Sequence, residues 1–502
     1  MVMATYFRIT LIHLFALLFS LTSNAQFQKE NAELNSMISQ GIEDWKIPAL
    51  SVLVMKDGKS IYKKTYGKKR INSTEKANNE TLFTMASTTK ALVAMGMAIL
   101  VDQGKVQWND KVRKHYPQFQ LSDSYITEDA RIKDLFTHNL GIGNADWLWY
   151  ARDLSTEETI QKFALTEQAY PLRGGYQYQN MGYVIAGEVI KAISGSRWDE
   201  FIKEHIFNPL GMSRTAAMSA DVLALGNVAT PHFDDHEEGV IPIDYAFFDQ
   251  AGAAGSIYSC IDDMEKYMTF IHNKGVINED TILKPATFEY LFSPKILIER
   301  GFYPTAQLTN PNWKSYAMGW FQHDYKGQKV DFHTGSIDGL VAIHGWLRNH
   351  DLGVYVFTNL DHAELRHAIM YKVFDLYALG GETAWNAEIY DLYSGFKKDY
   401  IKSLDKIESE RILDTNPSKS LKEYSGTYGN DIFGEFRITH NDQSLTASLN
   451  DKFDLTLRHW HHDTFRSDVQ PQWRSKVMIN FILNEQGKIG KLIFGDLEFV
   501  KQ

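Results

Sequence analysis

The chain has 502 residues, which is enough for two or three domains with a hydrophobic core each. Hydrophobic residues make up 44% of it and charged residues 23%, a globular composition that excludes a disordered protein. The formal net charge is −10 and Lys and Arg form no dense block, which disfavours nucleic acid or an anionic membrane as a partner.

The N-terminus has the three-part pattern of a secretory signal peptide. Arg8 precedes the apolar run ITLIHLFALLFSLTSNA, which ends in small residues before Gln26. An apolar core of about a dozen residues is too short to span a bilayer, which disfavours a transmembrane anchor. We therefore expect residues 1–25 to be cleaved after Ala25, leaving a periplasmic or secreted bacterial protein with no stable membrane anchor. The single cysteine, Cys260, can form no internal disulfide.

The first part of the mature chain alternates between strand and helix patterns. Residues 49–67 alternate apolar and polar side chains around Asp57-Gly58, which predicts a β-hairpin. From residue 87 a helix that is apolar almost all round runs to a stop at Gly104, so we expect it to be buried. Residues 129–211 have mainly helical periodicity, and strand-like runs return at 316–359.

This order of elements predicts an α/β (α+β) fold. One antiparallel sheet would be flanked by helices and interrupted by an all-helical insertion, with a site in the crevice between them. Residues 384 to about 413 have the pattern of a polar helix, and the sequence DTNPSKS ends this helix. About 80 residues of alternating strands and tight turns then predict a small antiparallel β-barrel or half-barrel. The predicted boundaries are 26–383 for the main domain, 384–417 for a helical linker and 418–502 for the barrel.

The start of the buried helix holds Ser87 and Lys90, one turn apart on the same side. A serine hydroxyl becomes a good nucleophile when a base takes its proton, and burial lowers the pKa of a lysine enough for it to be that base. The helix N-terminus also favours negative charge on the serine oxygen. The pair is therefore a candidate nucleophile and base. Four residues alone do not establish this, because Ser87 could instead cap the helix.

Two further motifs follow in order along the chain. Tyr178-Gln179-Asn180 precedes a predicted helix, and the tetrapeptide HTGS, which begins at His333, lies on a predicted strand. With Ser-x-x-Lys they resemble the three motifs of the penicillin-recognising serine hydrolases, a family of class C β-lactamases, D,D-carboxypeptidases, D-aminopeptidases and related esterases. The resemblance extends to about residue 380. The C-terminal module resembles the lipocalin-like module attached to some members.

The resemblance implies an acyl-enzyme mechanism that needs no metal and no cofactor. Ser87 would be acylated by the substrate, and Lys90 would serve as its base. Tyr178 would act as a second base and acid, passing a proton to the leaving group and then activating water. Asn180 would hold the substrate amide.

The resemblance also implies an oxyanion hole next to the His-Thr-Gly motif. Its donors would be the backbone N–H groups of Ser87 and of Ser336, which follows Gly335 in the motif. Each such donor contributes roughly 3–4 kcal/mol of transition-state stabilisation.

The third motif begins with His333 where β-lactamases and transpeptidases have a lysine. That lysine is a permanent cation that helps to bind the substrate carboxylate, whereas histidine is mostly neutral at pH 7. We therefore expect hydrolysis of a small amide or ester, such as a D-amino-acid peptide or ester. A β-lactamase or D,D-carboxypeptidase acting on penicillin or peptidoglycan peptides is the alternative.

A second alternative is a non-catalytic protein whose barrel binds an apolar ligand. The partner that we expect is a small-molecule or short-peptide substrate, and the oligomeric state stays open. Specificity should come from the helical insertion, from residues 144–153 and from the barrel.

Overall fold

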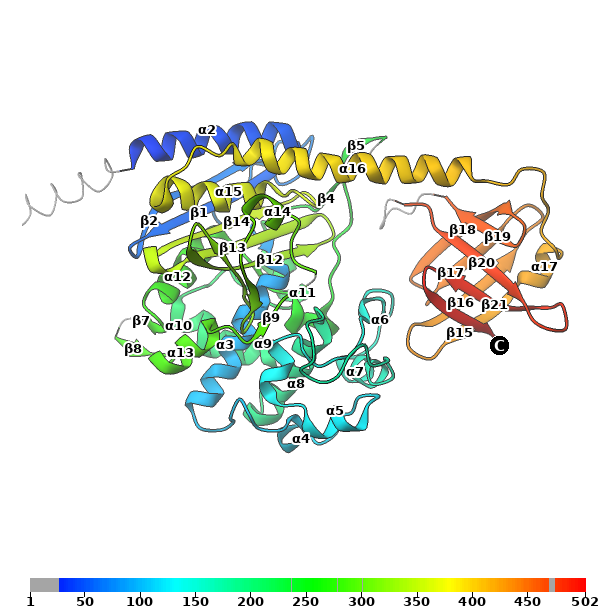
Figure 1. Ribbon diagram of the computed structural model, residues 1–502, viewed down its shortest axis with the longest axis horizontal. Coiled ribbons are helices and arrows are strands. Elements are labelled where there is room, and N and C mark those ends of the chain that lie inside the picture. Colours follow the sequence, from blue (N-terminus) through cyan, green and yellow to red (C-terminus); the bar gives the residue numbers. More distant parts are fainter. Residues whose placement is uncertain (1–26, 236, 278, 300, 469–474) are drawn as a thin grey trace, which may run out of the picture.

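The computed structural model describes residues 27–235, 237–277, 279–299, 301–468 and 475–502. The predicted signal peptide lies outside these ranges. Figure 1 shows two domains joined by the long helix α16 (Trp385–Ser409), which lies within the predicted linker. Among the described residues, no helix has both the length and the apolar character needed to cross a bilayer.

The main domain is built on one eight-stranded antiparallel sheet with the order β2-β1-β14-β13-β12-β11-β10-β9. The predicted hairpin is formed by β1 (Ala49–Lys56) and β2 (Lys59–Gly67). Pairing of β1 with β14 joins the beginning of the domain to its last strand. The other strands of the sheet are β9 (Ile296–Leu297), β10 (Lys314–Tyr316), β11 (Phe321–Tyr325), β12 (Gln328–Ile337), β13 (Leu340–Leu347) and β14 (Leu352–Thr358).

The strand-like run 316–323 is two strands rather than one. The chain turns after β10 and reverses into β11, with Gly319 at a φ of +82°. A Cβ on Gly319 would lie 2.8 Å from the backbone of Ala91, so glycine allows this turn to pack directly on the buried helix. Alternation of side chains along the run does not reveal such a turn.

Helices cover both faces of the sheet (Figure 1). On one face lie α2 (Gln28–Trp45), α15 (Leu365–Phe374) and the first part of α16. On the other lie α3 (Thr89–Asp102), α12 (Ile261–His272) and the helical insertion. The remaining helices are α4 (Val112–His115), α5 (Ser124–Asp129), α6 (Asp146–Tyr150), α7 (Thr156–Phe163), α8 (Asn180–Ser194), α9 (Trp198–Ile202), α10 (Asn208–Leu210), α11 (Ser219–Leu225), α13 (Pro285–Phe292), α14 (Ala306–Thr309) and α17 (Leu421–Tyr424).

Short elements complete the domain. The 3₁₀ turns are η1 (Ala86–Thr88), η2 (Ile132–Phe136), η4 (Asp249–Ala254) and η5 (Arg348–His350), and η3 (Lys203–Phe207) and η6 (Asp375–Leu379) are π-turns. Three two-stranded ribbons pair β3 (Phe83–Thr84) with β6 (Tyr258–Ser259), β4 (His232–Asp235) with β5 (Gly239–Pro242), and β7 (Val276–Ile277) with β8 (Asp280–Thr281).

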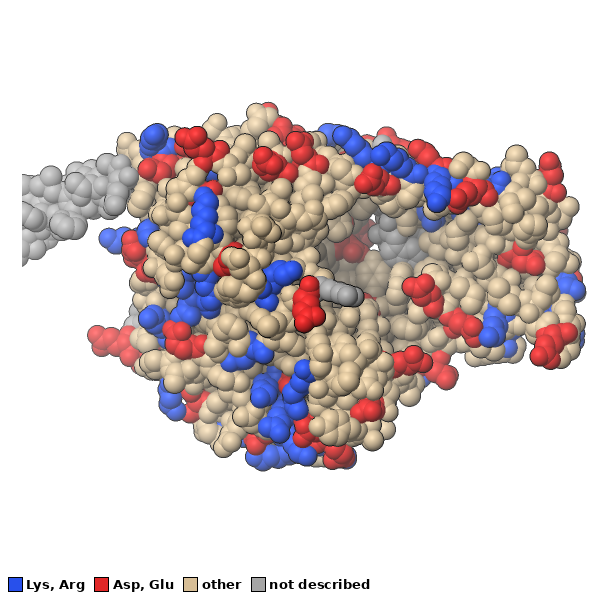
Figure 2. All heavy atoms as spheres, in the orientation of Figure 1, with Lys and Arg blue, Asp and Glu red and all other residues tan. Residues whose placement is uncertain are grey.

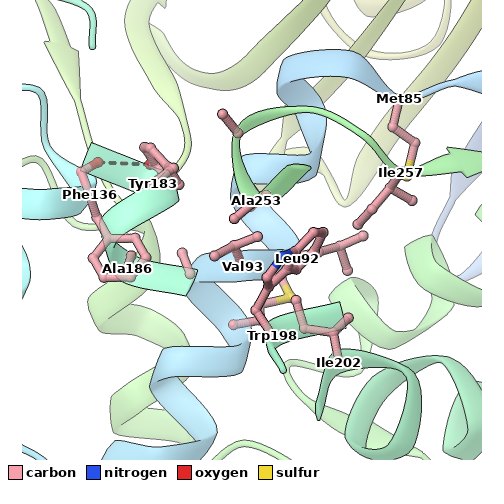
Figure 3. Close-up of a cluster of buried hydrophobic side chains, with 14 of the residues drawn as sticks. Met85, Leu92, Val93, Phe136, Tyr183, Ala186, Trp198, Ile202, Ala253 and Ile257 are labelled. Atoms are coloured by element: carbon pink, nitrogen blue, oxygen red, sulfur yellow. Dashed lines mark hydrogen bonds between the residues drawn. The ribbon is translucent and has the colours of Figure 1, made fainter. Parts of the chain in front are cut away.

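The prediction of a buried helix is confirmed by α3, in which every residue from Thr89 to Leu100 is buried. Figure 3 shows Leu92 and Val93 among side chains of the neighbouring helices, including Trp198 and Ile202 of α9. Each large aliphatic side chain buried in this way contributes roughly 1.5–3 kcal/mol. The helix is therefore a rigid base for the residues at its N-terminus.

The C-terminal domain is a closed eight-stranded antiparallel barrel, so the predicted fold class is confirmed for both domains. Its interior is filled by side chains, among them the rings of Tyr428, Phe436 and Phe481. This filled interior argues against a barrel that carries an apolar ligand. The strands are β15 (Gly426–Asn430), β16 (Gly434–His440), β17 (Leu445–Leu449), β18 (Phe453–His461), β19 (Thr464–Ser467), β20 (Met478–Leu483), β21 (Ile489–Phe494) and β22 (Leu497–Lys501).

The space-filling view shows the molecule hollowed between its two domains, below α16 (Figure 2). Side chains of Lys and Arg and of Asp and Glu lie interspersed on this face.

Candidate active site

Ser87 and Lys90 meet where the 3₁₀ turn η1 continues into α3. The Lys90 Nζ lies 3.0 Å from the Ser87 Oγ, 2.8 Å from the Asn180 Oδ1 and 2.7 Å from the backbone oxygen of Ala254. Ala86, just before the serine, has a φ of +44°, a strained conformation of the kind found at functional turns. The predicted pair is therefore in direct contact, on a strained turn.

Lys90 is 0% exposed, and this burial lowers its pKa to about 7 although the Asp146 carboxylate opposes the shift. An ammonium group at this position has an acceptor for each of its three N–H bonds. A neutral amine donates to Asn180 and Ala254 and directs its lone pair at the Ser87 hydroxyl. The three contacts thus suit a base for Ser87 once the proton is lost.

Tyr178 lies just before α8 and lines the same cavity as Ser87. Its ring is stacked on Phe321 with the ring planes 7° apart, and its centroid is 5.0 Å from the Lys90 Nζ. Burial raises the pKa of Tyr178 well above its usual value. In the resting site the side chain is therefore a neutral phenol that can donate a proton.

Asn180 is the first residue of α8 and is engaged at both ends of its amide. The Oδ1 accepts from Lys90, and the Nδ2 donates to the Asp146 Oδ1 at 3.0 Å. In this structure the amide oxygen holds Lys90. Asn180 also lines the cavity at Ser87, and its role in holding a substrate amide stays a prediction.

Gly335 and Ser336 lie on β12, which passes directly beside η1. A Cβ on Gly335 would lie 2.2 Å from the Met85 backbone oxygen and 2.9 Å from the Ser87 nitrogen, so a glycine is required there. This close approach brings the backbone of Ser336 beside Ser87, as the predicted oxyanion hole needs. Ser336 also lines the cavity at Ser87.

Arg366 of α15 hydrogen-bonds β12 at Gly335 and Ser336, and no sequence pattern predicted it. Its Nη1 donates to the Gly335 backbone oxygen at 2.5 Å and to the Ser336 Oγ at 3.1 Å. Its Nε and Nη2 donate to the two carboxylate oxygens of Glu364, which also contacts His367 at 2.7 Å. No motif marks these residues, because they come from the beginning of α15 and only packing brings them to β12.

His333 lies beside the site but does not line the cavity at Ser87, so its role in substrate binding stays a prediction. It is 1% exposed, with its Nε2 2.9 Å from the Tyr316 hydroxyl and its Nδ1 2.6 Å from the Thr334 backbone oxygen. Strand alternation puts it on the same face of β12 as Gly335, which approaches η1, and its ring centroid is 6.3 Å from that of Tyr178. Burial and nearby Lys90 lower the pKa of His333 to about 3, so it is neutral, as expected.

Ser87 and Asn180 line two adjoining cavities, a narrow one of about 60 Å³ and an open one of about 730 Å³. The walls of the larger cavity include the aromatic side chains of Trp147, Trp149, Tyr150, Tyr178, Tyr303 and Tyr393. Its charged lining consists of Asp146 and the Glu364–Arg366 pair, with the exposed His362 at the edge. Residues 144–153 thus contribute to the walls of the site.

The described residues contain no group of three or more His, Cys, Asp or Glu side chains that could hold a metal ion. A family profile described as "Beta-lactamase" matches residues 34–376. The chain belongs to the beta-lactamase family. The family predicted from the three motifs, and with it the assignment as a serine hydrolase, is confirmed. A domain of unknown function (DUF3471) matches residues 410–502, which contain the barrel.

Two curated proteins are similar in sequence to this chain. Unguisins hydrolase ungD' of Aspergillus campestris (strain IBT 28561) is 27% identical over 315 residues, which cover 60% of this chain and 57% of the relative. Protein flp of Staphylococcus aureus (strain MW2) is 23% identical over 354 residues, which cover 68% of this chain and 64% of the relative. The chain thus spans less than two thirds of the length of these curated relatives.

Solved structures share the fold of this beta-lactamase family member. The octameric penicillin-binding protein homologue from Pyrococcus abyssi has a TM-score of 0.60 and 22% identity, covering 94% of this chain and 99% of that chain. The D-amino acid amidase from Ochrobactrum anthropi SV3, solved with D-phenylalanine, has a TM-score of 0.57 and 20% identity. The match covers 68% of this chain and 99% of that chain.

Proposed function

We propose that this protein hydrolyses a small amide or ester, in particular a D-amino-acid peptide or ester, through an acyl-enzyme at Ser87. The observation that carries the proposal is the buried Lys90 amine, 3.0 Å from the Ser87 hydroxyl and with its pKa lowered to about 7. A serine with a neutral amine at this distance has the base that it needs.

In the acylation step, neutral Lys90 takes the hydroxyl proton while the Ser87 Oγ attacks the substrate carbonyl carbon. The developing oxyanion accepts hydrogen bonds from the backbone N–H groups of Ser87 and Ser336. Tyr178 gives its phenolic proton to the leaving nitrogen or oxygen as the carbonyl re-forms. The proton on Lys90 then restores the phenol, which leaves a neutral amine and an acylated serine.

In the deacylation step, a water molecule attacks the ester carbonyl and Lys90 takes one of its protons. Lys90 has this role in place of Tyr178, because burial keeps the phenol protonated. The oxyanion is held by the same two N–H groups as before. When the carbonyl re-forms, the bond to the Ser87 Oγ breaks, and this oxygen receives the proton from Lys90. The product acid leaves and the resting site is restored.

The charges around the cavity favour a substrate with a free amino group over one with a carboxylate. His333 is neutral and buried, so it presents no cation. The Arg366 guanidinium is bound to Glu364 and to backbone oxygens, so its donors are occupied. Asp146 adds a carboxylate to the lining. A cationic amine is therefore better accommodated than the carboxylate of a penicillin.

Active-site labelling and turnover test the proposal together. A fluorophosphonate should label the wild type and a control with a change at the half-buried Ser73, Ser73→Ala, and should spare Ser87→Ala. The wild type should then hydrolyse D-aminoacyl anilides or p-nitrophenyl esters faster than nitrocefin. Equal labelling of wild type and Ser87→Ala would overturn the role of Ser87. Preferred turnover of nitrocefin would replace the proposed substrate class with the β-lactam alternative.

We also propose a periplasmic or secreted location, supported by the signal-peptide pattern before Gln26. N-terminal sequencing of the protein recovered from a bacterial periplasm should begin at Gln26. Recovery from the cytoplasm with an intact N-terminus would contradict this.

A further inference from the structure

We propose that Asp146 is a positioning residue of the active site and that the C-terminal barrel holds it in place. The inference rests on the proposed function of Ser87 and Lys90. It concerns a contact path from the barrel through α6 to the catalytic lysine, which passes through Asp146 and Asn180.

Asp146 fixes the orientation of the Asn180 amide. Its Oδ1 accepts from the Asn180 Nδ2 at 3.0 Å and from the Trp149 Nε1 at 2.9 Å, and its Oδ2 accepts from the Asn144 Nδ2 at 3.0 Å. An ionised carboxylate only accepts hydrogen bonds, so Asn180 must turn its nitrogen to Asp146 and its oxygen to Lys90. The reverse orientation would place an amide N–H against the Lys90 amine, where both groups are donors.

The barrel packs on the residues around Asp146. The Trp147 ring meets the Phe494 ring edge-on with centroids 5.3 Å apart, and Tyr150 is stacked on Phe453 at 5.9 Å. The Asn450 Nδ2 donates to the Ala151 backbone oxygen at 2.9 Å. These contacts hold the segment next to Asp146 on the side that faces the barrel.

Further contacts continue this attachment along the chain. Ala151 is fully buried within the hydrophobic core of the barrel, and the Arg152 Nη1 donates to the Ile432 backbone oxygen at 2.7 Å. On the side of the main domain, the Tyr150 hydroxyl donates to Asp338 at 2.6 Å and Gln250 donates to the Trp149 backbone oxygen at 2.9 Å. The segment is therefore clamped between the two domains.

The charge of Asp146 also bears on Lys90. Around the Lys90 amine lie Ser87, the Asn180 oxygen and the Ala254 backbone oxygen, the rings of Tyr178 and Tyr183, and the imidazoles of His138 and His333. Burial keeps the tyrosines protonated and both imidazoles neutral. The Asp146 carboxylate raises the pKa of Lys90 against the effect of burial. Removing its charge should make the lysine lose its proton at lower pH.

The test uses the full chain and two measurements. The first is the rate of labelling by a fluorophosphonate as a function of pH, and the second is the NMR titration of the Lys90 ε-carbon, assigned with Lys90→Met. Asp146→Ala, which removes the acceptor of the Asn180 Nδ2, should slow labelling about 10- to 100-fold. Asp146→Asn removes the charge but keeps an oxygen that can accept from Asn180, and it should move both midpoints to lower pH. Asp146→Glu, which keeps the charge, should keep the midpoint close to that of the wild type.

Trp147→Ala tests the role of the barrel, with Trp460→Ala as its matched control. Trp460 is a buried barrel tryptophan that packs on Arg411 and Arg466 rather than on α6. We expect Trp147→Ala to slow labelling and to shift the Lys90 titration in the same direction as Asp146→Asn. Trp460→Ala should be labelled at a rate within about twofold of the wild-type rate, because a change far from the active site acts independently of it.

An unchanged labelling rate in Asp146→Ala together with an unchanged Lys90 titration in Asp146→Asn would overturn the role of Asp146. Equal effects of Trp147→Ala and Trp460→Ala would overturn the role of the barrel. If the wild type is not labelled at all, the proposed function fails, while the Lys90 titration still decides whether Asp146 acts on the lysine.

Discussion

The contact between Gly335 and the nucleophile turn leads to a prediction for Gly335→Ala. An added Cβ would lie 2.2 Å from the Met85 backbone oxygen and 2.8 Å from the Ala86 Cβ. Ordinary contact begins at 3.4 Å, so β12 and η1 must separate by about 1.2 Å. The closest atom belongs to the backbone and a Cβ cannot rotate away, so no side-chain rotation can relieve the contact.

This separation should act mainly on the oxyanion hole. The N–H groups of Ser87 and Ser336 lie on opposite sides of the widened contact, so they can no longer both reach one oxygen. Misplacement of about 1 Å costs on the order of 100-fold in rate, or about 2.7 kcal/mol. Overpacking should also lower the free energy of unfolding by about 1–3 kcal/mol.

The assay is the fluorophosphonate labelling rate of folded protein, with the melting temperature measured in parallel. Gly345→Ala, on the neighbouring strand β13, is the control. Its added Cβ would lie 2.6 Å from the Sδ of Met370 on α15, which is the flexible end of a side chain and can move. The control substitution should destabilise the protein with little effect on labelling. A labelling rate for Gly335→Ala within threefold of the wild type would refute the argument from contact geometry.

Three further predictions follow from buried charges. The rate of fluorophosphonate labelling of the wild type should increase as the pH rises through about 7, because Lys90 becomes neutral. A labelling rate that falls over this range would contradict the assignment of Lys90 as the base. His333→Lys should lower the melting temperature without creating nitrocefin turnover, because it buries an unpaired cation outside the cavity lining. Glu364→Gln should cost about 3–5 kcal/mol in urea unfolding, because it leaves the buried Arg366 charge uncompensated. Contacts with Arg366 and His367 lower the pKa of Glu364, so its contribution to stability is present above the carboxyl's unfolded pKa and is lost in acid. The difference in unfolding free energy between the wild type and Glu364→Gln should therefore shrink in acid, and a difference that does not change with pH would contradict this.

Much of the fold was predictable because its signals are local. The hairpin around Asp57-Gly58, the apolar helix behind Lys90 and the alternating strands of the second domain all depend on short-range periodicity. Closure of the barrel was not predictable, since it depends on pairing between β15 and β22, which are far apart in the sequence. The turn at Gly319 was also missed, because what requires it is a contact with α3.

The sequence by itself determined that Ser87 and Lys90 meet, because they are one helical turn apart and any helix places them together. The order of the three motifs likewise identified the beta-lactamase family. Only the tertiary structure decided that His333 is buried outside the cavity lining, that Asn180 holds Lys90, and that Asp146 and Arg366 lie at the site. The physical reason is that these roles depend on which face of a strand meets which loop, and that is set by packing between distant segments.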